Sequence, residues 1–108
     1  MARELPAGWD SELPVFTSKD VLATRESASR AEQAIAQKMW SMFGGAADLN
    51  ESTFTDIKGG GDFEPGNFGG RNLHFGIREH GMCAILNGIA LFGGFIPFGS
   101  SFMVFTDY

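Results

Sequence analysis

The fold is decided by the stretch LHFGIREHGMCAILNGIALFGGFIPFG, residues 73–99. Its first residues, Leu73 to Phe75, form a short apolar run that predicts a strand. Arg78 to Phe92 carries apolar residues on nearly every face, which predicts a helix that is buried all round. The segment from Phe95 to Tyr108 is rich in Phe and Val and predicts another buried strand. A strand, a helix and a strand in succession indicate an α/β layer fold.

The residues before this stretch predict one more helix and one more strand. Apolar residues recur at intervals of three and four from Ser27 to Trp40, which predicts an amphipathic helix with Ser27 or Thr24 as its N-cap. Met42 to Leu49 is a short apolar run that predicts a buried strand, and its end delivers Asp48 to the edge of a sheet. Functional residues often lie at such strand ends, so Asp48 is a candidate site residue.

Two segments lack any period. Residues 1–16 combine prolines, a glycine and charged residues, which predicts a lead-in or linker that Trp9 and Phe16 anchor, followed by a domain over 17–108. Asn50 to Arg71 holds six glycines and is too long to be a mere connection. Its string GGGDFEPGNFGG, residues 59–70, lacks the lysine followed by Ser or Thr of a phosphate loop. The glycines either allow tight turns or place backbone amides against a ligand.

Composition excludes two kinds of partner. The net charge is −5 and the eight Lys and Arg residues are scattered, whereas nucleic-acid binding needs clustered basic residues. The apolar region from Met82 to Phe98 is interrupted by Asn87 and by glycines, and it is shorter than the ~20 residues of a bilayer-spanning helix. We therefore expect no nucleic acid and no membrane. The single cysteine, Cys83, cannot form an internal disulfide, which favours a reducing cytoplasm.

The end of the sequence predicts a piece of a longer protein. A length of 108 residues fits one small domain or part of a larger one. The last predicted strand stops at Tyr108 without a closing helix and would leave an open sheet edge. We therefore expect a truncated domain, and we expect the isolated chain to aggregate or to stay partly molten.

Several residues could carry chemistry. The string GIREHGM, residues 76–82, puts Glu79 at the start of an apolar helix, where it is either an N-terminal cap or a catalytic group. His74 and His80 have no Cys or second carboxylate at ligand-like spacing, so we expect structural or substrate-contacting roles and no metal ligand. Three aromatic residues recur at intervals of three and form either a core stripe or a wall for a flat ring: Phe102, Phe105 and Tyr108. The residues alone favour the core.

Taken together, the motifs resemble the transketolase family. They occur in the family's order and cover nearly the whole chain: Gly-Trp-Asp at 8–10 before Leu-Pro at 13–14, Ala-Thr-Arg at 23–25, Gly-Gly-Ala-Ala-Asp-Leu at 44–49, Gly-Asp-Phe and Pro-Gly-Asn within 61–67, Gly-Arg-Asn at 70–72, Gly-Ile-Arg-Glu-His-Gly-Met at 76–82, and Ser-Phe-Met-Val-Phe-Thr-Asp-Tyr at 101–108. The resemblance implies the first half of a pyrimidine-binding domain, which is an incomplete three-layer α/β/α unit with a mostly parallel sheet.

The resemblance also implies an activity, which is the transfer of a two-carbon ketol unit from a ketose phosphate to an aldose phosphate. The implied cofactor is thiamine diphosphate, with Mg²⁺ or Ca²⁺ bound by a diphosphate-binding domain outside this chain. The implied partners are sugar phosphates and a second subunit, in a homodimer whose active sites lie between subunits. A dihydroxyacetone synthase-type enzyme remains an alternative, as does a non-catalytic fragment or split subunit that is inactive without a partner chain.

Residue roles follow from the same resemblance. Glu79 matches the glutamate that hydrogen-bonds the cofactor's aminopyrimidine, a task that suits an apolar setting such as Met82, Cys83 and Ile85 would provide. The aromatic residues that match the wall of the cofactor's rings are Phe102, Phe105 and Tyr108, and Asp48 matches an acidic residue near the thiamine.

The substrate-binding residues implied by the family are Arg25 and Ser52, which match residues that grip the sugar phosphate. The family usually has Ser where Ala46 stands and often Pro where Glu51 stands. The loop that carries Ser52 therefore departs from the family's pattern.

Overall fold

A three-stranded sheet forms the centre of the computed structural model, which describes residues 4–107. The strands lie in the order β2-β1-β3 and are β1 (Met42–Ala46), β2 (Asn72–His74) and β3 (Ile96–Ser100). Both neighbouring pairs are parallel, and Ala46 lies opposite His74 on one side and Ser100 on the other. The carboxyl ends of all three strands therefore meet at one edge of the sheet.

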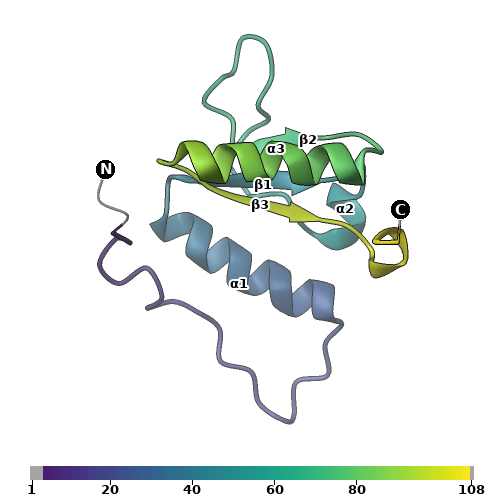
Figure 1. The fold of residues 1–108 in the computed structure, drawn as a ribbon. Coiled ribbons are helices and arrows are strands. Elements are labelled where there is room, and N and C mark those ends of the chain that lie inside the picture. Colours follow the sequence, from purple (N-terminus) through teal and green to yellow (C-terminus); the bar gives the residue numbers. More distant parts are fainter. Residues whose placement is uncertain (1–3, 108) are drawn as a thin grey trace.

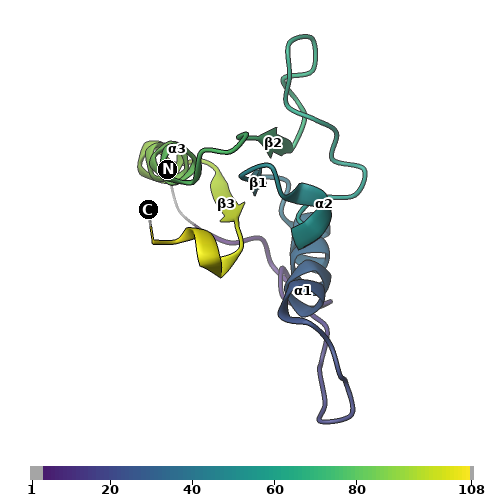
Figure 2. The ribbon, with the colours of Figure 1, turned by 90° about the vertical axis from the view of Figure 1, so that its right-hand side faces the viewer.

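The two long helices cover opposite faces of this sheet. The helices are α1 (Thr24–Lys38), the short α2 (Asn50–Thr53) and α3 (Glu79–Phe92), and a 3₁₀ turn, η1 (Met103–Phe105), follows β3. Seen end-on in Figure 2, α3 lies on one side of the strands, and α1 and α2 lie on the other. This arrangement confirms the predicted α/β class with a parallel sheet in three layers.

Each face of the sheet has its own core cluster. On the α1 side the buried residues are Ala36, Met39, Met42 and Ile57, with Trp9, Ile35 and Phe98 packed against them. On the α3 side they are Ala47, Phe75 and Met82, with Leu73 and Leu86 against them. Trp9 therefore anchors the lead-in as predicted. Phe16 is exposed, so its predicted anchoring role is wrong.

Strand β1 packs so closely between its neighbours that it requires glycine at two positions. A Cβ atom added at Gly44 would collide with the carbonyl group of Phe98, and one added at Gly45 would collide with that of Leu73. Because both obstacles are backbone atoms, no side-chain rotation relieves the clash. The two glycines of the string GGAADL thus allow the sheet to close around its central strand.

Hydrogen bonds from two polar residues tie α1 and the long loop to the sheet. Arg71 donates from Nη1 to the carbonyl of Ala36 (2.9 Å), from Nη2 to that of Met39 (2.7 Å) and from Nε to that of Met42 (3.0 Å). The bonds to Ala36 and Met39 satisfy carbonyl groups at the C-terminal end of α1, which a helix leaves without partners, and the bond to Met42 joins Arg71 to the start of β1. Buried Asn72 accepts a bond from the amide of Ile57 (2.7 Å) and donates to its carbonyl (3.1 Å).

Helix α1 begins three residues earlier than the sequence predicted. Its N-cap is Ala23, whose side chain has no polar atom, so the prediction of Ser27 or Thr24 as the cap is wrong. The Glu26 carboxylate accepts the amide N–H of Ala23 at 3.1 Å and satisfies this end of the helix instead. Ser27 donates its hydroxyl to the carbonyl of Thr24 (2.9 Å).

Three predicted segments are shorter or more exposed than expected. Strand β1 ends at Ala46, because Asp48 adopts a left-handed conformation with φ of 61° that turns the chain. Strand β3 ends at Ser100, and η1 replaces the rest of the predicted strand. Helix α3 contacts the sheet along one side only, so Ile85 (51% exposed) and Leu91 (82% exposed) face outward. The prediction of a helix buried all round is wrong for this chain.

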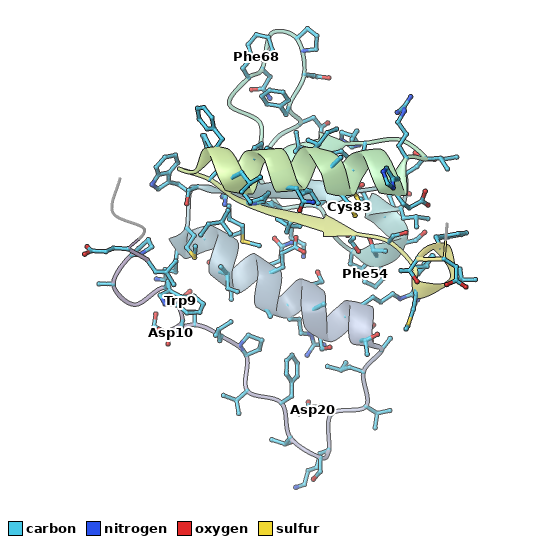
Figure 3. The ribbon with its side chains drawn as sticks, in the orientation of Figure 1. Trp9, Asp10, Asp20, Phe54, Phe68 and Cys83 are labelled. Carbon is cyan, nitrogen blue, oxygen red and sulfur yellow. The ribbon has the colours of Figure 1, made fainter. Side chains whose placement is uncertain are left out.

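The loop from residue 59 to residue 70 projects from the body of the molecule (Figure 1). Phe68 lies near its tip in Figure 3 and packs against Phe63 with ring centroids 5.7 Å apart. The loop folds back through hydrogen bonds between its own backbone groups, among them Asn67 N to Glu64 O (2.9 Å). Its glycines serve tight turns, with φ of 69° at Gly61 and 89° at Gly66.

Within residues 4–107, no helix is both long enough and apolar enough to cross a bilayer. Cys83 is a free thiol and is exposed on α3 (Figure 3).

Candidate functional site

The candidate site residues gather at the carboxyl edge of the sheet. Asp48 follows β1 by two residues, Glu79 begins the helix after β2, and Phe102 follows β3 by two residues. Since the three strands are parallel and in register, these segments leave the sheet at the same edge. Figure 1 shows α2 and the C-terminal turn together at this end of the molecule. In open parallel sheets this edge is the usual place for ligands.

Glu79 is the first residue of α3 and is half-buried. Its neighbour Arg78 turns back and donates from Nη1 to the carbonyl of Phe75 (2.7 Å), so it serves the backbone rather than Glu79. The start of a helix favours a negative charge. Of the three apolar neighbours expected around Glu79, Met82 is buried, whereas Cys83 and Ile85 are exposed.

The turn after β1 is fixed by Asn50, which sequence reasoning missed. Asn50 is buried, accepts the amide N–H of Ala46 through Oδ1 (3.0 Å) and donates from Nδ2 to Asp56 Oδ1 (2.6 Å). These bonds hold the start of α2 against the end of the central strand and thereby position exposed Asp48 at the edge. An Asn after an Asp-Leu pair is a weak turn signal that could have indicated this role.

A cavity of about 330 Å³ opens at this edge. Its polar lining consists of Asp48, Asn50, Glu51, Ser52, Asp56 and His74. Two of the predicted site residues, Asp48 and Ser52, therefore share one cavity. The other polar residues were not predicted as site residues, apart from His74, for which a structural or substrate-contacting role was expected.

Arg25 and Ser52, predicted to grip a sugar phosphate, lie together although they are 27 residues apart. The Arg25 guanidinium donates from Nη1 to the Ser52 carbonyl (3.1 Å) and lies over the Phe54 ring, with 5.0 Å from Cζ to the ring centroid. Figure 3 places Phe54 at the same end of the molecule as the C-terminal turn. Arg25 remains exposed, so part of its guanidinium fork is accessible from solvent.

The structure describes two of the three residues that were predicted to form an aromatic wall. Phe102 is 36% exposed and Phe105 is half-buried in η1, while Tyr108 lies outside the described residues. The core clusters of residues 4–107 include neither phenylalanine. The residues alone favoured a core position, and that preference is wrong for Phe102.

His74 and His80 differ in their surroundings. His74 Nε2 lies 2.9 Å from Asp62 Oδ1, and this hydrogen bond raises the pKa of His74 above its usual value, with burial opposing the shift. His80 is exposed in the first turn of α3. The described part of the chain contains no group of three side chains that could hold a metal ion.

Sequence reasoning missed a carboxyl group, that of Glu32, which interacts electrostatically with Asp56 of the cavity lining. Burial raises the pKa of Glu32 to about 7, and the charge of Asp56 adds to this shift. Glu32 Oε1 is buried and has no hydrogen-bond partner. The same α1 helix contacts Asp56 through Gln33, which donates from Nε2 to the Asp56 carbonyl (2.7 Å). A carboxyl group on the inner side of an amphipathic helix was the available signal.

The fold and the site together define a class of protein, a parallel α/β domain with its functional residues at the carboxyl edge of the sheet. Residues 20–108 match the family described as transketolase, pyrimidine binding domain, and the chain belongs to that family. Membership of this family implies thiamine diphosphate as the cofactor.

Named relatives agree with this assignment. The chain is 50% identical to a transketolase of Geobacillus stearothermophilus over 97% of its own length, and 46% identical to one of Nostoc over 100%. Each match spans only 16% of the relative. A Pichia stipitis transketolase solved in complex with sedoheptulose 7-phosphate superimposes with a TM-score of 0.88 at 40% identity, covering 97% of this chain and 17% of that one.

A Campylobacter jejuni transketolase gives a TM-score of 0.82 at 40% identity and covers 96% of this chain. The chain therefore spans about one sixth of the length of these relatives.

Proposed function

We propose that this chain supplies the pyrimidine-activating half of a transketolase active site. The reaction is the transfer of a two-carbon ketol unit from a ketose phosphate to an aldose phosphate. The observation that carries the proposal is the position of Glu79, half-buried as the first residue of α3 at the carboxyl edge of a transketolase-type sheet. The relatives that share this sheet are transketolases at 40–50% identity.

The residues at this edge fit an aminopyrimidine ring. Glu79 offers a carboxyl group that is not paired with Arg78, and Phe102 offers an exposed aromatic face two residues beyond β3. In the proposed site Glu79 hydrogen-bonds a ring nitrogen and holds the proton there, while Phe102, Phe105 and Tyr108 flank the ring and exclude water. Asp48 lies close to the thiamine. Bound thiamine diphosphate supplies the nucleophilic carbon of the reaction.

The sugar phosphate is bound by Arg25 and Ser52. Arg25 is already oriented by Phe54 and by the Ser52 carbonyl, so binding a phosphate costs little side-chain entropy. A guanidinium can offer two parallel donors to phosphate oxygens, and the Ser52 hydroxyl adds a third.

The remaining parts of the site come from outside this chain. We propose that a diphosphate-binding domain holds the cofactor's diphosphate with Mg²⁺ or Ca²⁺, and that active sites lie between the subunits of a homodimer. The exposed apolar side of α3, including Ile85 and Leu91, is consistent with a covering subunit. The domain boundary at residue 17 stays a prediction. The free thiol of Cys83 favours a reducing compartment such as the cytoplasm.

The proposal is tested by mixing this chain with a chain that carries the diphosphate-binding domain. Ketol transfer from xylulose 5-phosphate to an aldose phosphate is measured in the presence of thiamine diphosphate and Mg²⁺. We expect transfer only in the mixture, and a loss of at least about 100-fold with Glu79→Gln. If every such mixture is inactive, the chain is a non-catalytic fragment. A preference for formaldehyde as the acceptor would indicate a dihydroxyacetone synthase-type enzyme instead.

A further inference from the structure

The cavity at the carboxyl edge is lined by more acidic than basic side chains. Three carboxylates line it, namely Asp48, Glu51 and Asp56, and His74 is the only basic lining residue in the described part of the chain. These carboxylates would repel a phosphate dianion except beside Ser52, where the Arg25 guanidinium supplies a positive charge. Sugar hydroxyl groups suit the same lining, because carboxylate oxygens accept their hydrogens.

The ring of His74 is held in one orientation. Its Nε2 lies 2.9 Å from Asp62 Oδ1, and since a carboxylate only accepts hydrogen bonds, Nε2 carries the hydrogen. Nδ1 is then the ring atom left for a ligand. Asp62 comes from the loop before β2, so this loop orients a side chain that lines the cavity.

The charged groups around His74 favour its protonated form. Asp62 has the largest effect, and Asp56 and Glu64 act in the same direction, whereas burial opposes them. Protonated His74 donates from Nδ1 to a ligand oxygen, and neutral His74 accepts at the same atom. Either form can bind a hydroxyl group, but the protonated form donates the stronger, charge-assisted bond.

We propose that His74 is a substrate-contacting residue that binds a hydroxyl group of the sugar chain, and that Asp62 is the positioning residue that fixes its ring. The inference rests on the proposed function. The phosphate lies at Arg25 and Ser52, and the hydroxylated carbons extend past His74 into the cavity. His74 thereby contributes to the choice among sugars rather than to the chemical step.

The first test measures kcat and KM for a ketose phosphate in the active holoenzyme. His74→Ala raises KM about tenfold and changes kcat less than about twofold, as expected for one lost hydrogen bond to substrate. Asp62→Asn raises KM less and moves the pH dependence of KM to lower pH. The control is Gln37→Ala, because Gln37 is an exposed polar residue of α1 that lies outside the cavity lining. An unchanged KM in folded His74→Ala and His74→Gln overturns the inference.

The second test separates the hydroxyl groups from the phosphate. Inorganic phosphate is used as a competitive inhibitor, and its inhibition constant is expected to stay unchanged in His74→Ala but to rise in Arg25→Ala. If His74→Ala raises the inhibition constant of phosphate by the same factor as KM, His74 binds the phosphate group and the proposal is contradicted. If the native enzyme transfers no ketol unit, the proposed function fails. Calorimetric titration of ketose phosphate into the native protein and His74→Ala then tests His74 separately, and equal affinities overturn the inference.

Discussion

The α1 side of the sheet and its carboxyl edge are built differently. On the α1 side Arg71 donates to three carbonyl groups and buried Asn72 bonds Ile57 twice, and Glu32 Oε1 is the exception, buried without a partner among the described residues. At the carboxyl edge Glu79 is half-buried, and Asp48 and Phe102 are exposed. Paired and buried residues stabilise the fold, whereas residues left accessible are free to bind a ligand. Substitutions on the α1 side should reduce stability, and substitutions at the edge should reduce activity.

The largest expected loss of stability follows from Gly45→Val. The added side chain would collide with the carbonyl group of Leu73, a backbone atom of the neighbouring strand, so we expect more than ~3 kcal/mol of destabilisation. Urea denaturation of the protein measures this loss. Gly69→Ala is the matched control, because a Cβ there meets nothing within 4 Å. A Gly45→Val protein with native stability would show that β1 does not pack as described.

Arg71→Ala should cost about 3 kcal/mol, because it leaves three backbone carbonyl groups without their donor. Thermal denaturation measures the loss. Arg30→Ala, on the exposed side of α1, should stay within ~0.5 kcal/mol of the native protein. If the two substitutions reduce stability equally, the hydrogen bonds of Arg71 contribute no more to stability than an exposed side chain does.

The smallest effect concerns Glu32 and depends on pH. Its folded-state pKa of about 7 exceeds the ordinary value of 4.5, so between pH 4.5 and 7 the unfolded chain ionises while the folded protein keeps its proton. Stability from this group is therefore complete below pH 4.5 and declines as the pH rises towards 7.

Glu32→Gln should remove this decline and leave the variant about 1 kcal/mol more stable than the native protein at pH 8, after allowing for solvent screening. Denaturation curves at pH 4, 6 and 8 measure the difference. Glu4→Gln, at an exposed position, serves as the control. A stability difference that does not vary with pH would contradict the assignment.

The sequence predicted the regular elements well, because hydrophobic periodicity reports which side of an element is buried. The helix over Glu79–Phe92 and the strand starting at Met42 appear where apolar runs placed them. The cap of α1 was missed because Glu26 replaces a cap side chain by bonding the Ala23 amide directly. The outer side of α3 was expected to be buried because its residues are apolar. Hydropathy does not distinguish residues buried within this chain from apolar residues left exposed on it.

The site could be predicted only in part. Motifs indicated Glu79, Asp48, Arg25 and Ser52 as candidate site residues, and the structure brings the last two together. The contact between Asp62 and His74 and the bond between Asn50 and Asp56 depend on how the loop folds back, which no spacing in the sequence encodes. The left-handed turn at Asp48 likewise has no sequence signal comparable to glycine.

The most direct test of the account is Glu79→Gln in the reconstituted ketol-transfer assay, with stability measured on the same protein. Glutamine keeps the shape of the side chain and replaces the titratable carboxyl group with an amide that does not ionise. We expect activity to fall at least about 100-fold, as for loss of a general acid–base group, with stability within ~0.5 kcal/mol of the native protein. Native-like activity in Glu79→Gln would contradict the catalytic role of Glu79, and a large loss of stability would show that Glu79 is a structural helix cap.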